Sequence, residues 1–283
     1  MNTSNQSYKE LAIPYFKEVF EIIDNAMIQH QIPYYLIGVN AIALELLKKG
    51  IKPSRGTKDI DFAIMISTIK QYEQLGDTLV QYGFNRVKAP WTFYSNQYNV
   101  AIDILPFGEI EEHDTGQFNQ RYSDLHILGF KEVLEETEKV EIEDKIVNIP
   151  PLPGMVILKL VAWSDRPNER ENDLADILRI IGHYFDHNFD EIVEFHNDTF
   201  SDKEFDQLLI SAEVLGRKAR TILLKSKELE KRILNVLDTN INDDKESKIA
   251  KDWAIKKGWE IKYALKIIRA FRKGIQTRET ESH

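Results

Sequence analysis

Three prolines within four residues, Pro150, Pro151 and Pro153, divide this chain of 283 residues into two halves with different patterns. Proline fixes φ and has no backbone N–H, so such a run interrupts both helices and strands. Before it, short apolar strands alternate with amphipathic helices, and after it every segment has helical periodicity. The sequence therefore predicts an α+β fold, with a mixed β-sheet and helices in residues 1–150 and a helical domain in residues 151–283.

The periodicity also predicts the individual elements. In the first half it predicts helices at 7–30, 39–49 and 68–82, strands at 34–37, 59–66, 84–87, 91–94 and 98–105, and a hairpin of 140–142 with 146–149. In the second half it predicts helices at 154–164, 169–185, 188–196, 202–213, 215–237 and 249–275. Glycines mark some of the expected helix ends, as at Gly50 and Gly83, because glycine readily adopts the left-handed conformation of a C-terminal cap.

Composition and charge exclude several classes of protein. The chain has no cysteine, which excludes disulfides and thiolate metal sites and suits a reducing compartment. It has no apolar run of membrane-spanning length and no signal-like start at Met1 to Gln6, so we expect a cytoplasmic protein without a membrane partner. Because the net charge is −9, a polynucleotide would have to bind a local basic patch or bridging cations.

Two aspartates lie on one face of the predicted strand 59–66. Side chains alternate along a strand, so Asp59 and Asp61 share one face, while the opposite face is apolar and is expected to be core. Neighbouring carboxylates repel each other unless a cation neutralises them, and Mg²⁺ commonly binds one or two carboxylates together with substrate phosphates. The alternative interpretation is a solvated strand end at which two aspartates alternate by chance.

Four neighbouring residues favour the metal interpretation. Gly38 ends a predicted strand and begins a helix, whose free backbone N–H groups can bind a phosphate. Arg55 and Thr57 precede the aspartates and are expected to reach phosphate oxygens. Asp103 lies in the middle of another apolar strand, where an acid is unfavourable without a partner. If that strand lies beside the strand of Asp59, three carboxylates converge and can hold metal ions for in-line phosphoryl displacement.

Lys159 is the one polar residue in the apolar segment 155–163. A helix this apolar is buried nearly all round, so the ammonium needs an anion, which either a triphosphate or a carboxylate supplies. The alternative is a lysine whose ammonium reaches water. Asp173 and Asp176, three residues apart on the next predicted helix, can position Lys159 or act as general bases. Asp173 lies nearer the buried edge, whereas we expect Asp176 to be a solvated acid that complements the helix dipole.

These residues form a recognisable pattern. Gly38-Val39-Asn40-Ala41 is followed by Arg55-Gly56-Thr57-Lys58-Asp59-Ile60-Asp61, then by Lys159-Leu160-Val161-Ala162, Arg166 and Asp173-Leu174-Ala175-Asp176. The pattern resembles the nucleotidyltransferase superfamily of DNA polymerase beta-like enzymes. Within that superfamily it is most similar to the AbiEii/AbiGii-type group, whose members include toxins of toxin–antitoxin systems. The resemblance covers residues 30–185 and implies a nucleotidyltransferase-like sheet followed by the helical region.

The resemblance implies an enzyme of the EC 2.7.7 type, which transfers a nucleoside monophosphate from an NTP such as ATP or GTP to an acceptor hydroxyl. The acceptor would be a small molecule, a tRNA or a protein, and an antitoxin protein is an implied partner. Asp59, Asp61 and Asp103 would bind magnesium, or manganese in its place. The nucleotide would contact Gly38, Val39, Asn40, Arg55, Thr57 and Lys159. Asp173 would be a catalytic or orienting acid, so the helical domain would contribute Lys159 and Asp173 to the site.

Position 39 departs from the family pattern, because it is valine where glycine or serine is usual. A β-branched side chain there would crowd a phosphate or remove a hydroxyl that binds it, whereas the amide of Asn40 would compensate. This departure motivates a second hypothesis, a non-catalytic protein of the same fold that binds a nucleotide or pairs with a regulator.

Overall fold

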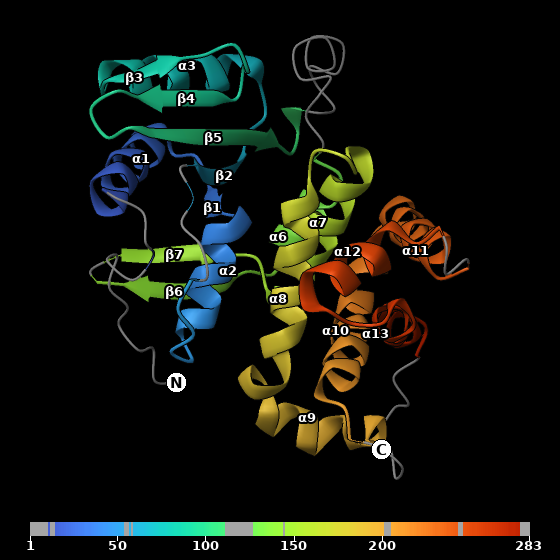
Figure 1. Ribbon diagram of the computed structural model, residues 1–283. Coiled ribbons are helices and arrows are strands. Elements are labelled where there is room, and N and C mark those ends of the chain that lie inside the picture. Colours follow the sequence, from blue (N-terminus) through green and yellow to red (C-terminus); the bar gives the residue numbers. More distant parts are fainter. Residues whose placement is uncertain are drawn as a thin grey trace. The chain divides into compact units, whose positions relative to one another are not determined.

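The computed structural model describes residues 11, 15–53, 57, 59–110, 127–143, 145–200, 205–242 and 246–277 (Figure 1). It divides into two compact units, Met1–Pro150 and Pro151–His283. The α+β class predicted from the sequence is confirmed, since the first unit contains a mixed sheet and the second is helical. None of the helices in the described ranges combines the length and the apolar character that crossing a membrane requires.

The first unit is built on a five-stranded sheet with the strand order β1-β2-β5-β4-β3. Its elements are α1 (Phe16–His30), β1 (Tyr34–Leu36), α2 (Gly38–Leu47), β2 (Asp59–Met65), α3 (Ile69–Gln81), β3 (Phe84–Arg86), β4 (Thr92–Ser95), β5 (Val100–Phe107), α6 (Phe130–Leu134), β6 (Glu138–Ile142) and β7 (Lys145–Ile149). Strands β2 and β5 are parallel, while β1–β2, β4–β5 and β3–β4 are antiparallel. Strands β6 and β7 form the predicted hairpin.

The apolar faces of β2 and β5 form the centre of this unit's core. Ile60, Phe62 and Ile64 of β2 are fully buried, as are Ile102 and Ile104 of β5. In the parallel pair Ile60 lies opposite Ile102 and Phe62 opposite Ile104. The period-two pattern predicted for strand 59–66 is therefore confirmed, and it leaves the aspartates on the opposite face.

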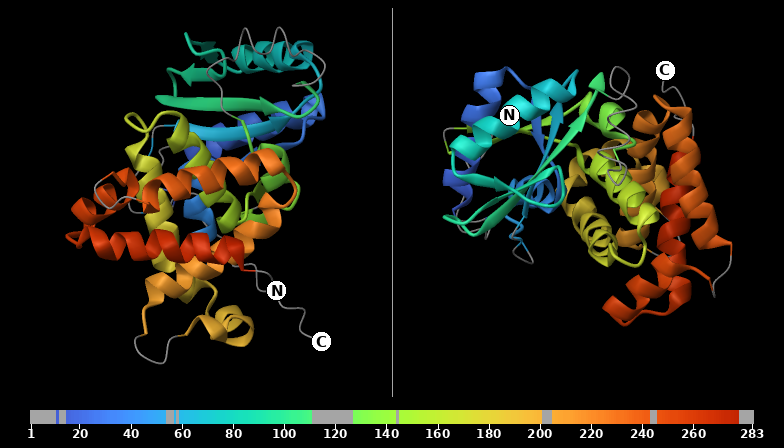
Figure 2. Two further views of the ribbon diagram at one scale, coloured as in Figure 1. Left: turned by 90° about the vertical axis from the view of Figure 1, so that its right-hand side faces the viewer. Right: turned by 90° about the horizontal axis from the view of Figure 1, so that it is seen from above.

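The second unit contains seven α-helices within its described residues. They are α7 (Leu152–Asp165), α8 (Glu171–His187), α9 (Phe189–Phe195), α10 (Gln207–Leu223), α11 (Lys227–Ile241), α12 (Lys248–Lys257) and α13 (Ile261–Gln276), with a 3-10 helix, η2 (Asn197–Thr199), before α10. Figures 1 and 2 show α10 and α13 lying side by side.

Two predicted helix boundaries in this unit are wrong. The chain does not break near residue 214, because α10 continues to Leu223 and the next helix begins after Ser226, whose hydroxyl accepts from the N–H of Leu229. The single helix predicted at 249–275 is two helices, because Gly258 ends α12 in the left-handed conformation with φ 67°. The pattern of apolar residues continues across that glycine, so periodicity alone does not reveal the break.

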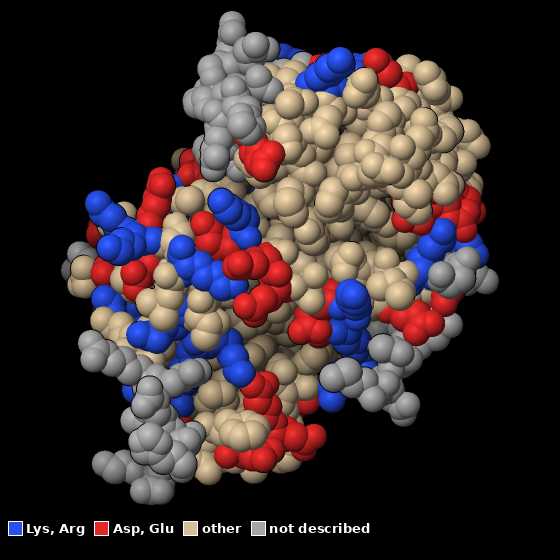
Figure 3. All heavy atoms as spheres, turned by 180° about the vertical axis from the view of Figure 1, so that it is seen from behind, with Lys and Arg blue, Asp and Glu red and all other residues tan. Residues whose placement is uncertain are grey.

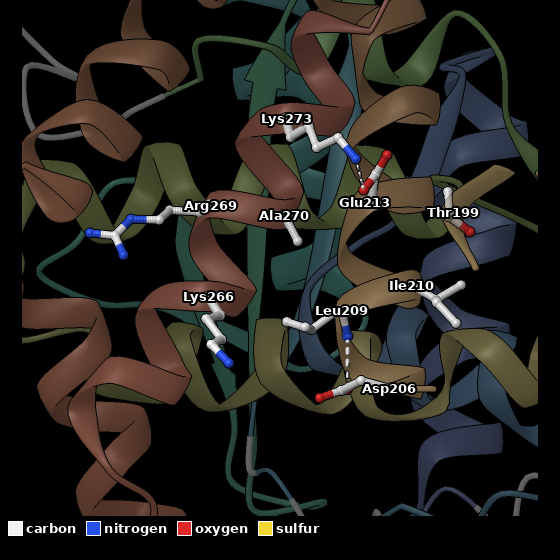
Figure 4. Close-up of a pocket in the computed structure, with 9 residues that line it drawn as sticks. All are labelled: Thr199, Asp206, Leu209, Ile210, Glu213, Lys266, Arg269, Ala270 and Lys273. Carbon is white, nitrogen blue, oxygen red and sulfur yellow. Dashed lines mark hydrogen bonds and ion pairs between the residues drawn. The ribbon is translucent and has the colours of Figure 1, made fainter. Parts of the chain in front are cut away.

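Helices α10 and α13 approach each other so closely at one point that only glycine fits. A Cβ atom on Gly216 would lie 2.1 Å from the carbonyl oxygen of Phe271, and one on Gly274 would lie 2.0 Å from that of Glu213. Beside this crossing the two helices line an open pocket of about 430 Å³ (Figure 4). Its lining residues are Thr199, Asp206, Leu209, Ile210, Glu213, Lys266, Arg269, Ala270 and Lys273. Of the described residues that were predicted to form the active site, none lines this pocket.

Candidate active site

Two of the three predicted carboxylates lie side by side in the sheet. Asp61 of β2 is the register partner of Asp103 of β5, and Asp59 lies two residues earlier on the same face. Neighbouring strands are separated by about 4.8 Å, so the carboxylates of Asp61 and Asp103 face the same space. Asp59 is exposed, while Asp61 and Asp103 are half-buried. The expectation that the strand of Asp103 lies beside the strand of Asp59 and Asp61 is therefore confirmed.

Asp61 lies against the first residue of α2. Gly38 has a φ of +69°, and a Cβ atom on it would lie 2.1 Å from Oδ2 of Asp61. Glycine is required here both for the backbone conformation and for the space that the carboxylate occupies. The backbone N–H of Ile37 also donates to the carbonyl oxygen of Asp61 at 2.9 Å. The carboxylate therefore lies at a helix N-terminus, where the backbone N–H groups and the helix dipole favour negative charge.

The other nucleotide-site residues predicted near β2 have different surroundings. Asn40 is 2% exposed, and its Nδ2 donates to the carbonyl oxygen of Asp59 at 3.1 Å, so its amide joins α2 to the start of β2. The hydroxyl of Thr57 accepts from the N–H of Asp59 at 3.2 Å. Val39 is buried, and Arg55 lies outside the described residues. A nucleotide contact at any of these positions stays a prediction.

Asp103 has a polar neighbour that the sequence pattern did not single out. Thr92 of β4 is its register partner on the other side, and the Thr92 hydroxyl donates to Oδ1 of Asp103 at 2.5 Å. This hydrogen bond restricts the rotation of the carboxylate. Threonine is common in strands, so its residue type indicates a strand but not a role in the site. The register that places Thr92 beside Asp103 is seen only in the folded sheet.

The carboxylate pair can supply part of the ligand shell of a divalent cation. Among the described residues, no three Asp, Glu, His or Cys side chains lie close enough together to hold a metal ion by themselves. Asp61 and Asp103 are two oxygen-donating side chains on adjacent strands, and Mg²⁺ characteristically takes one or two carboxylates and completes its shell with water and phosphate oxygens. The residues therefore suit a metal ion that arrives with a phosphorylated substrate.

In the helical unit, Lys159 forms a buried cluster of charges. Its Nζ donates to Oδ1 of Asp173 at 2.7 Å and to Oδ2 of Asp176 at 2.8 Å. The other oxygen of Asp173 accepts from Nη1 of Arg170 at 3.2 Å. Asp173 and Asp176 are 7% and 4% exposed. Two cations and two carboxylates thus neutralise one another where α7 packs on α8.

The electrostatics of this cluster keep Lys159 charged. Burial is the largest single influence and lowers the pKa of Lys159, but attraction and hydrogen bonds from Asp173 and Asp176 together outweigh it, so the pKa is raised above its usual value. The anion that we expected beside the buried Lys159 ammonium is therefore a pair of carboxylates, those of Asp173 and Asp176. The expectation that Asp176 is a solvated acid is wrong, because Asp176 faces α7 at the point where the Lys159 ammonium needs a partner.

Comparison with solved structures finds distant likenesses, three of which are described here. An antigenic nucleotidyltransferase-like protein from Paracoccidioides brasiliensis is 14% identical over 81% of this chain and 94% of its own, with a TM-score of 0.39. The antibiotic-resistance factor ANT(2'')-Ia is 12% identical over 77% of this chain and 93% of its own, with a TM-score of 0.39. JHP933 from Helicobacter pylori is 17% identical over 83% of this chain and all of its own, with a TM-score of 0.33.

No protein-family model and no curated protein matches the sequence. At the identities and TM-scores of the three structures, likeness carries no functional argument. The candidate site therefore rests on the geometry of this chain: two carboxylates side by side on parallel strands, next to a helix N-terminus that begins with a glycine of positive φ.

Proposed function

We propose that this protein transfers a nucleoside monophosphate from an NTP to an acceptor hydroxyl and releases pyrophosphate. The observation that carries the proposal is the parallel register of β2 and β5, which places Asp61 beside Asp103. Paired carboxylates next to a helix N-terminus suit the charge of a triphosphate and its metal ion. In phosphoryl-group transfer most of the catalysis is positioning and charge stabilisation, which is what such a site supplies.

The residues of the first unit have separate roles in this proposal. Asp61 and Asp103 would hold Mg²⁺, or Mn²⁺ in its place, with Asp59 beside them on the same face. Such an ion neutralises phosphate charge and polarises the phosphorus–oxygen bonds. The backbone N–H groups at Gly38 would bind a phosphate. The acceptor oxygen forms a bond to the α-phosphorus, the bond from that phosphorus to the bridging oxygen breaks, and the hydroxyl proton passes to a carboxylate of the site.

Lys159 and Asp173 are assigned a structural role before a catalytic one. Their ion pair neutralises the charge of Lys159 inside the helical unit, so a triphosphate would have to compete with two carboxylates for the ammonium. We therefore assign Lys159, Asp173 and Asp176 first to the stability of the helical unit. Contact of Lys159 with nucleotide is a separate proposal, which is tested by nucleotide affinity in a variant whose fold is retained.

The test uses the full chain with each α-labelled NTP, Mg²⁺, and separate acceptor pools of cellular RNA, small metabolites and protein. Asp61→Asn removes one charge from the carboxylate pair with little change of shape. Asp77→Asn is the matched control, because Asp77 is an aspartate of the same unit that is 69% exposed and forms a surface ion pair with Arg86. We expect label to enter one pool with the wild type and Asp77→Asn but not with Asp61→Asn. Equal labelling by all three proteins, or none by any, contradicts the proposal.

A second candidate is a nucleotide-binding protein without turnover, motivated by valine at position 39, where the family pattern usually has glycine or serine. It predicts Mg²⁺-dependent NTP binding that Asp61→Asn weakens, with no labelled product in any acceptor pool.

A toxin role, implied by the resemblance to the AbiEii/AbiGii-type group, is a further part of the proposed function. It predicts that expression of the wild type arrests growth, whereas expression of Asp61→Asn to the same level does not.

A further inference from the structure

Phenylalanine rings form a partly exposed patch on and next to α9. Figure 1 shows α9 at one end of the helical unit. Phe185, near the C-terminal end of α8, is buried, and its ring centroid lies 5.7 Å from that of Phe189 and 5.5 Å from that of Phe205. Phe200 lies 6.0 Å from Phe205. Phe189 and Phe205 are nevertheless 50% and 58% exposed, and Val193, one turn after Phe189, is 40% exposed. We call Phe185, Phe189, Val193, Phe200 and Phe205 the phenylalanine patch.

A contiguous patch differs from scattered exposed hydrophobic residues. Single apolar side chains on a surface are ordinary, but large ones in mutual contact mark surfaces that other molecules cover. The rings belong to α8, to α9, and to the positions just after η2 and just before α10, and their contacts make them one surface and not several separate side chains.

The segment that carries much of the phenylalanine patch is rich in acidic residues. Residues 185–198 contain five acidic residues and no lysine or arginine: Asp186, Asp190, Glu191, Glu194 and Asp198. Glu191 and Asp198 form ion pairs with Lys218 and Arg217 of α10. Asp186, Asp190 and Glu194 are exposed, and in the described part of the chain no lysine or arginine pairs with them. In Figure 3, acidic side chains lie beside uncharged surface at the lower edge of the picture.

We propose that the phenylalanine patch is a docking site for a lysine- and arginine-rich amphipathic segment of another protein. Apolar side chains of that segment would pack on Phe189, Val193 and Phe205. Its cations would lie near Asp186, Asp190 and Glu194 and over the exposed ring faces, where cation–π attraction adds to the ion pairs.

The charge of the surface selects this occupant among the alternatives. Nucleic acids and anionic membrane surfaces carry negative charge, which the acidic rim repels. A second copy of this chain carries a net charge of −9 and is repelled at long range in the same way. A basic amphipathic protein segment is attracted by the acidic residues and can bury the apolar rings, so of these candidates it matches both the charge and the apolar character of the surface. The proposal concerns the helical unit and does not depend on nucleotidyl transfer.

The experiment measures binding of a labelled synthetic helical peptide, with leucine on one face and lysine on both flanks, to the full chain by fluorescence anisotropy. We expect saturable binding that weakens as salt is raised. Phe205→Ser should weaken it by about tenfold or more, as truncation of an aromatic anchor does at interfaces. The double charge reversal Asp190→Lys and Glu194→Lys should weaken it as strongly without removing any apolar contact.

Two matched variants control for non-specific binding. Ile255→Ser removes an apolar side chain of α12 that is 81% exposed and outside the patch, and Glu228→Lys reverses an exposed charge on α11. Both should bind the peptide like the wild type. Each of three results overturns the proposal: no saturable binding, equal loss in the controls, or equal binding of a peptide with glutamate in place of lysine. A wild-type dimer that Phe205→Ser dissociates, or RNA or anionic vesicles bound through the patch, would assign it to another occupant and overturns the proposal as well.

Discussion

Replacing Lys159 with methionine should destabilise the helical unit strongly, because it leaves two buried carboxylates facing each other. Asp173 and Asp176 are 7% and 4% exposed, and Lys159 contributes the ammonium that contacts both at 2.7 Å and 2.8 Å. Removing one partner of a buried ion pair costs about 3–5 kcal/mol. Arg170 still pairs with Asp173 and offsets part of this cost, although its side chain is 47% exposed and solvent screens the pair. We therefore expect a loss near the lower limit, about 3 kcal/mol.

The assay is urea unfolding followed by tryptophan fluorescence, to which Trp163, Trp253 and Trp259 of the helical unit contribute. Lys218→Met is the matched control, because it breaks a half-exposed ion pair with Glu191 and should cost less than about 1 kcal/mol. The reasoning is refuted if Lys159→Met costs no more than the control. A normal stability with weaker NTP binding would instead support the nucleotide contact predicted for Lys159.

The pH dependence of stability follows from the same cluster. The folded-state pKa of Lys159 is raised, so the ion pairs contribute their full stabilisation below pH 10.5, the ordinary pKa of lysine, and lose it as the pH rises through the folded pKa. The wild type should therefore lose stability in the alkaline range above that value. Lys159→Met lacks this component, and its unfolding free energy should change less over the same interval, as measured by urea unfolding at several alkaline pH values.

Three further predictions concern glycines and a hydrogen bond. Gly38→Ala places a methyl group 2.1 Å from Oδ2 of Asp61 at a φ of +69°, so it should displace that carboxylate and strain the backbone. We expect the rate of nucleotidyl transfer to fall strongly while the unfolding free energy falls by only roughly 1 kcal/mol, both measured on the same preparation. Gly216→Ala should lower stability by about 1–3 kcal/mol in thermal unfolding, since its Cβ meets backbone and not a flexible side chain. Thr92→Val should weaken Mn²⁺ binding, followed by electron paramagnetic resonance, by about tenfold or more because Asp103 loses its hydrogen bond, and Thr92→Ser should restore it.

The elements around the site could be predicted from the sequence because each has a local signal. Alternation in strand 59–66 separates Asp59 and Asp61 from the core, and the glycine at position 38 marks the turn from strand to helix. Thr92 had no such local signal. Its role comes from the pairing of β4 with β5, which places it opposite Asp103. Asp176 was misjudged for a related reason: whether an acid on a helix is solvated depends on which helix packs over it.

The apolar residues of β2 and β5 also position the carboxylates. The register that buries Ile60 opposite Ile102, and Phe62 opposite Ile104, necessarily places Asp61 opposite Asp103 between them. A slip of one residue would turn the whole apolar set of one strand toward the aspartate face, so the core excludes that alternative. The hydrophobic effect therefore brings two like charges together, against their mutual repulsion. A site formed in this way needs no dedicated loop to hold the carboxylates, and it exists whenever the sheet is folded.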